Sequence, residues 1–91
     1  MLLVLPTELT HAQAAACLRM LVQAQKAQQD AQVVVDAGAL ARFDSSALAV
    51  LLACRRAVLA QGKAFAVKAM PAALDRLARL YGVRELLADA A

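Results

Sequence analysis

Residues 42–56, with the sequence RFDSSALAVLLACRR, decide the fold because a polar start leads into the most apolar segment of the chain. Every residue from 47 to 54 is apolar, which fits a helix buried against a sheet. Asp44 or Ser45 supplies a side-chain oxygen for the unpaired amides of its first turn. The helix is predicted to run to about Ala60, where Gln61 and Gly62 end it.

Apolar segments on both sides of this helix predict strands. Residues 2–5 form a short apolar run that ends at Pro6, which has no amide to give to a sheet. Three consecutive valines at 33–35 suit a strand buried on both faces, in the middle of a sheet. A third strand is expected after Gly62, where Phe65 and Val67 alternate with more polar neighbours.

Two further helices complete the alternation. Thr10 can cap a helix from His11 or Ala12 to near Gln29. Another begins at Pro71 and stops at Gly82. Its apolar stripe is expected to contain Leu74, Leu77, Ala78 and Tyr81. The order strand, helix, strand, helix, strand, helix predicts one α/β domain over residues 1–91, with a small, mostly parallel or mixed sheet and three to four helices.

Composition narrows the classes of function. The net charge of +3 is spread along the chain, and only three residues are aromatic, so the stacking and basic stripe of a nucleic-acid module are missing. No apolar run reaches the length of a membrane span, which takes roughly eighteen residues. The first residues do not resemble a signal peptide. We therefore expect a cytoplasmic protein.

Residues for catalysis or for binding a cofactor or metal are not predicted. The single histidine, His11, has no nucleophile beside it in the sequence and fits a surface group at a helix start. Cys17 and Cys54 lie among apolar neighbours without the spacing of a metal site, so both are expected in the core. The three glycines fit turns, and none forms a phosphate-binding loop.

The Asp-Ser-Ser sequence at 44–46 has two interpretations. As a helix cap, the Asp44 carboxylate and one serine hydroxyl satisfy amides at the positive end of the helix dipole. The second interpretation adds a functional surface, because two hydroxyls beyond Asp44 exceed what capping requires. They also follow a central strand, where open α/β sheets place their sites.

Residues 33–83 resemble the STAS domain, which is shared by anti-sigma factor antagonists, sulfate-transporter tails and MlaB-type subunits of phospholipid-transporting ABC systems. The resemblance rests on a strand ending in Asp36, followed by Asp44, Ser45, Ser46, Ala47 and Leu48, which correspond to Asp-Ser/Thr-x-Gly-Leu with alanine in place of glycine. The sequences LAVLL, LAQGKAF and LARLYGVRELL are most similar to the MlaB type.

The MlaB-type resemblance implies a non-catalytic subunit that binds and supports an ABC transporter ATPase. Its contact with the inner membrane would be indirect, through this partner. The resemblance places the partner surface at the start of the second helix, with Ala47 and Ala49 allowing close approach. The expected partner-binding residues are Arg42, Phe43, Asp44, Ser45, Ser46, Ala47 and Ala49.

Two alternatives stay open. Phe43 serves either as an apolar anchor for the partner or as part of the small core. In anti-sigma factor antagonists, a hydroxyl of the Asp-Ser/Thr pair is phosphorylated by an anti-sigma factor kinase. The resemblance to that branch makes Ser45 and Ser46 candidate phosphoacceptors.

Overall fold

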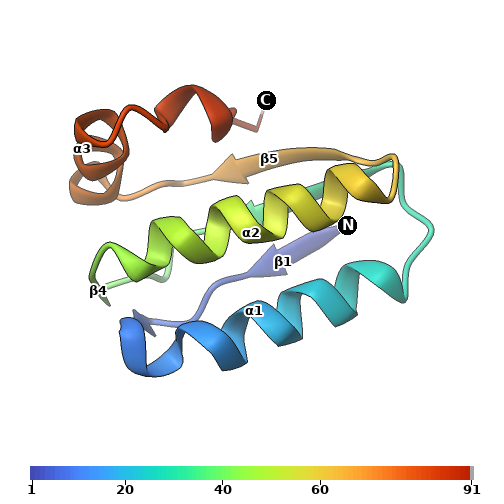
Figure 1. Ribbon diagram of the computed structural model, residues 1–91, viewed down its shortest axis with the longest axis horizontal. Helices are drawn as coiled ribbons and strands as arrows, with labels where there is room; N and C mark the ends of the chain where they lie inside the picture. The colour runs from blue at the N-terminus through green and yellow to red at the C-terminus, as the bar shows by residue number, and fades with distance from the viewer. Residues whose placement is uncertain (91) are drawn as a thin grey trace.

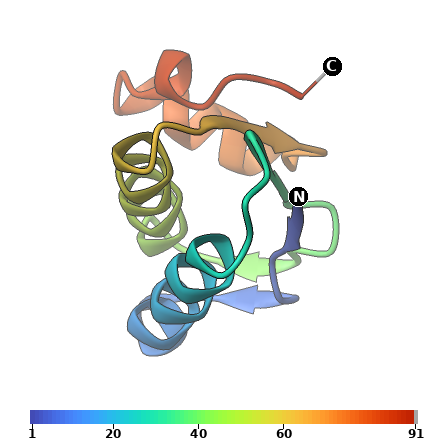
Figure 2. The same ribbon diagram turned by 90° about the vertical axis from the view of Figure 1, so that its right-hand side faces the viewer.

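The computed structural model describes residues 1–90 as a parallel sheet with two long helices on one face. The strands β1 (Leu2–Val4), β3 (Gln32–Asp36) and β5 (Ala64–Lys68) lie in the order β1-β3-β5. The helices α1 (His11–Lys26) and α2 (Ser46–Ala60) run side by side (Figure 1). Figure 2 shows both helices on the same side of the sheet, and no helix within residues 1–90 lies over its opposite side. The predicted α/β class and the central place of the valine strand in the sheet are confirmed. Its predicted burial on both faces is wrong, because Val33 and Val35 are buried whereas Val34, on the open face, is only partly buried.

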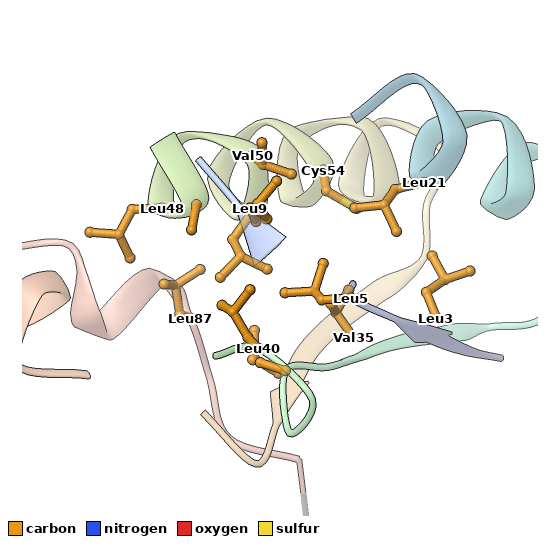
Figure 3. Close-up of a cluster of buried hydrophobic side chains, with 14 of the residues drawn as sticks. Leu3, Leu5, Leu9, Leu21, Val35, Leu40, Leu48, Val50, Cys54 and Leu87 are labelled. Atoms are coloured by element: carbon orange, nitrogen blue, oxygen red, sulfur yellow. The ribbon is translucent and has the colours of Figure 1, made fainter. Parts of the chain in front are cut away.

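Alternation along the strands builds the core between the sheet and these helices. Leu3, Val35 and Val67 share one row across the three strands, and all three are buried. Figure 3 shows apolar side chains from the sheet and from α2 meeting in this layer. Cys17 of α1 and Cys54 of α2 are buried as free thiols, as expected from their apolar neighbours.

A second pair of strands was not predicted from the sequence. The two-residue strands β2 (Glu8–Leu9) and β4 (Arg42–Phe43) pair in parallel, apart from the main sheet. Each immediately precedes the start of a long helix. Segments this short carry no measurable alternation, so only their pairing identifies them.

Several element ends differ from the predicted ones. Helix α1 ends at Lys26, earlier than the predicted end near Gln29. The ammonium group of Lys63 donates to the backbone oxygen of Gln25 and, at 2.7 Å, to that of Gln28. A cation from outside the helix therefore satisfies carbonyls at its end. Helix α2 ends at Ala60 as predicted, followed by Gly62 with φ of 73°. No helix within residues 1–90 has the length and apolarity that crossing a membrane requires.

The segment after β5 also differs in part from expectation. Pro71 lies just before α3 (Ala72–Leu80), whose buried face includes Leu74 and Ala78. Tyr81 was predicted to belong to this apolar stripe, and that prediction is wrong. The residue follows the end of the helix, and 58% of its surface is exposed.

The C-terminal segment, which the sequence left unassigned, belongs to the core. A 3₁₀ turn, η1 (Arg84–Leu86), leads to the fully buried Leu87. Beyond it, Val67 of β5 donates to the backbone oxygen of Ala88 at 2.8 Å and accepts from the amide of Ala90 at 2.9 Å. These bonds cover the outer edge of β5. The guanidinium of Arg84 holds the turn by donating to Asp75, to Asp89 and to the backbone oxygen of Leu87.

Replacing Leu87 with alanine tests this role of the C-terminal segment. Removal of a fully buried leucine side chain is expected to lower the free energy of unfolding by about 2–4 kcal/mol. The neighbouring Leu86 is 42% exposed, so Leu86→Ala is the matched control and is expected to cost less than about 1 kcal/mol. Urea unfolding followed by circular dichroism measures both, and equal losses would contradict the assignment.

Ala69 adopts a left-handed backbone conformation, with φ of 57°, immediately after β5. A side chain in this region costs about 1–2 kcal/mol, whereas glycine adopts it freely but loses more entropy on folding. Ala69→Gly is therefore expected to raise the free energy of unfolding by about 0.5–1 kcal/mol. The control Ala64→Gly, at an exposed position within β5, should lower it by about the same amount. Thermal melting of the two variants would show opposite shifts.

Candidate functional site

The carboxylate of Asp44 joins the starts of the two long helices. Its Oδ1 accepts a hydrogen bond of 2.8 Å from the amide of Ser46, the first residue of α2. Its Oδ2 accepts one of 3.1 Å from the amide of His11, the first residue of α1. The Ser45 side chain makes no capping hydrogen bond. Of the two predicted capping residues, Asp44 therefore provides the cap, and it serves both helices.

The paired strands β2 and β4 explain how residues 33 positions apart meet. Their register places Leu9 beside Phe43, so the chain enters both helices from adjacent points. The first turn of α1 is fixed separately, because Oε1 of Gln13 accepts from the amide and the hydroxyl of Thr10, each at 2.8 Å. Nε2 of Gln13 then donates to Glu8 at 2.9 Å. Gln13 thus links the start of α1 to β2 through hydrogen bonds with Thr10 and Glu8.

The two amides also set the electrostatics of the site. The backbone hydrogen bond from Ser46, followed by the one from His11, lowers the pKa of Asp44 below its ordinary value. The positive ends of two helix dipoles meet at this carboxylate, which favours its charged form further. Asp44 is therefore ionised at neutral pH and committed to holding the two helices.

The predicted partner-binding residues differ in how far they reach the surface. Arg42, Ser45 and Ala49 are exposed, and so is Asp44. Ser46 and Phe43 are partly buried, and Phe43 packs against the core. Ala47 has no exposed surface, so its small side chain makes room within the core and offers nothing to a partner.

The contact of His11 with this site was not predicted from the sequence. His11 was considered alone, as a surface group at the start of a helix. The structure places it across from Asp44, whose Oδ2 accepts from its amide. The order of elements contained a usable signal: α1 and α2 both follow parallel strands, and helices that do so begin at the same edge of a sheet.

The cysteines do not contribute a reactive group. Burial raises the pKa of Cys17, and burial together with the nearby Cys17 raises the pKa of Cys54 to about 11. Both thiols therefore stay protonated at neutral pH, whereas nucleophilic and metal-binding cysteines act as thiolates. The exposed start of α2 therefore remains the candidate functional site.

Comparison with known families decides what kind of domain this is. A family model described as "Mlab, STAS domain" matches residues 1–88. The chain belongs to the MlaB-like STAS domain family. No curated protein matches it. STAS domains are generally non-catalytic interaction modules, which agrees with a site made of a helix cap and an exposed hydroxyl.

The low pKa of Asp44 in this STAS domain makes its stability depend on pH. A carboxyl whose pKa is lowered by folding stabilises the protein above its unfolded pKa, about 3.9, and stops doing so as the pH falls through the folded pKa. Asp44→Asn is therefore expected to lower the melting temperature by a few degrees at pH 7. The difference from the wild type should shrink steadily below about pH 4.

Thermal melts of both proteins between pH 7 and pH 2.5 measure this difference. Glu85→Gln, which removes an exposed carboxylate outside the site, serves as the control and should melt like the wild type at pH 7. A deficit of Asp44→Asn that stays constant across the whole range would mean that the charge of Asp44 has no part in holding the helices.

Proposed function

We propose that this STAS domain is a cytoplasmic, non-catalytic subunit that binds the ATPase of a phospholipid-transporting ABC complex and supports its assembly or activity. Such a complex maintains the lipid asymmetry of the outer membrane. The domain would lie at the inner membrane only through its partner. Membership of the MlaB-like family supports this proposal over the other branches that share the STAS fold.

The observation that carries the proposal is the exposed Ser45 at the start of α2, where the Asp44 carboxylate holds the backbone in place. Both oxygens of Asp44 are used by backbone amides, so this carboxylate positions the surface. Exposed Arg42 and Ala49 flank Ser45. We call Arg42, Ser45 and Ala49 the α2 surface. A partner meets one long cationic group, one hydroxyl and one small side chain there.

The physics of such a contact is favourable. The backbone at the start of α2 is held by Asp44 before binding, so little backbone freedom is lost there when a partner docks. The hydroxyl of Ser45 can donate and accept hydrogen bonds, and Ala49 allows the partner's backbone to approach. In this proposal the chemistry in the complex belongs to the ATPase.

Phosphorylation of Ser45 by an anti-sigma factor kinase is the second candidate function. The exposure of the side chain favours it, since a kinase can reach Ser45 while Ser46 is partly buried. A phosphate at this position would meet the positive ends of two helices but would also lie close to the charge of Asp44. The test below separates this function from the transporter role.

Two variants that place a negative charge on the α2 surface test the proposal. Ser45→Glu and Ala49→Glu are expected to remove at least nine-tenths of the ATPase recovered with the tagged protein from its native cells. Ala60→Glu is the matched control, because Ala60 is an exposed alanine at the opposite end of the same helix. Mass spectrometry of the co-purified chains and a melting curve for each variant complete the experiment.

Recovery of an ABC ATPase by the wild type and by Ala60→Glu, but not by the two other variants, is the expected result. Equal recovery by all of the proteins would rule out the α2 surface as the contact. Recovery of a small kinase, with phosphate on Ser45, would replace the transporter role with that of an anti-sigma factor antagonist. If Ser45→Glu unfolds while the other variants stay folded, Ser45 is needed for folding and is not assigned to partner binding.

A further inference from the structure

The two edges of the main sheet are treated differently within the chain. Beside β5, the backbone of Ala88 and Ala90 pairs with Val67, so this edge is covered. Beside β1, no strand of residues 1–90 pairs with the outer side, because β1 has β3 as its one neighbour in the sheet. The β1 edge is therefore open to another strand.

The hydrogen bonds of β1 show which backbone groups this edge presents. The carbonyl of Met1 accepts from Val34, and the amide of Leu5 donates to Asp36, both at 2.9 Å. Odd-numbered residues thus bond to β3, and the amides and carbonyls of Leu2 and Val4 point to the outer side. Unpaired groups at alternate residues are what an added strand requires.

The side chains along the β1 edge lack the usual protection against pairing. Natural edge strands often carry a charged residue that prevents another chain from joining. Residues 2–5 are all apolar, and Leu2 and Val4 are 53% and 55% exposed. Pro6 protects only the point where the strand ends. Leu2 and Val34 also line a hollow of about 470 Å³ on the open face of the sheet.

We propose that two copies of this domain pair through their β1 strands, antiparallel and centred on Leu3. In this register Leu2 lies opposite Val4 of the second copy, and Val4 lies opposite its Leu2. Each of these pairs exchanges both of its backbone hydrogen bonds, so the edge is complementary to itself. The exposed side chains of both strands meet on the open face, and residues 2–5 bring no charged side chain to the junction. The N-terminal ammonium group of Met1 is paired within its own copy with Asp30, at 3.0 Å. Lys68, which lines the same hollow as Leu2, belongs to β5 at the other edge of the sheet.

The size of the contact sets its strength. A stable interface of standard size buries roughly 800 Å² per partner, more than one short strand and its neighbours provide. The contact is therefore weak, and we expect a dissociation constant of about 10–100 µM. The β1 edge shares no residue with the α2 surface, which consists of Arg42 in β4, Ser45 just before α2 and Ala49 in α2. Both surfaces can therefore be occupied at once.

Sedimentation velocity of the purified protein from about 5 to about 500 µM, a range that brackets the expected dissociation constant, tests the proposal. The wild type should sediment faster as its concentration rises. Leu2→Glu and Val4→Lys each place an unpaired charge in the junction and should weaken association at least tenfold. Leu80→Lys is the control, because Leu80 is an exposed apolar residue on α3, at 78% exposure, and should associate like the wild type.

An equal mixture of Leu2→Glu and Val4→Lys tests the register itself. In a mixed pair Glu at position 2 faces Lys at position 4, while the native Val4 and Leu2 face each other, so association should return towards that of the wild type. A monomeric wild type at every concentration would overturn the proposal, as would variants that associate unchanged. Weak association that the mixture does not restore would overturn the proposed register.

Discussion

The interaction on which the arrangement of helices depends is the double hydrogen bond of Asp44. A single carboxylate accepts from the first amide of α1 and from the first amide of α2. In most helices a cap satisfies one end, whereas here one side chain fixes two helix starts relative to each other. The surface around Ser45 inherits its shape from this contact.

The main sheet is covered on one face and along one edge only. Two helices cover one face, the C-terminal residues cover the edge of β5, and the β1 edge and the second face stay open. A domain this small buries a limited fraction of its surface, so each apolar residue counts towards stability. Leaving Leu2 and Val4 exposed is therefore a cost that a second strand would remove.

Periodicity in the sequence predicted the elements that are long enough to show it. The three valines of β3, the apolar run of α2 and the glycine at its end were assigned correctly. The strands β2 and β4 were missed, because two residues have no period and pair only through the tertiary fold. Tyr81 was misplaced because the helical stripe was extended one residue beyond the end of α3.

The candidate site was predicted in outline and corrected in detail. The Asp-Ser-Ser sequence located the helix start, and the cap was expected at Asp44 or Ser45. Spacing along the chain could not show that Asp44 also reaches His11, since that contact depends on how β2 and β4 align the two segments. Exposure likewise separated Ser45 from Ala47, which were both predicted to bind the partner: Ser45 is exposed and Ala47 is fully buried.

The position of Leu87 has a consequence for how the protein is made. This fully buried side chain, and the backbone that pairs with Val67, come after every helix and strand of the main sheet. During synthesis the core stays incomplete until residues up to 90 have left the ribosome. Until then the nascent chain lacks Leu87 in its core, and the outer edge of β5 is uncovered.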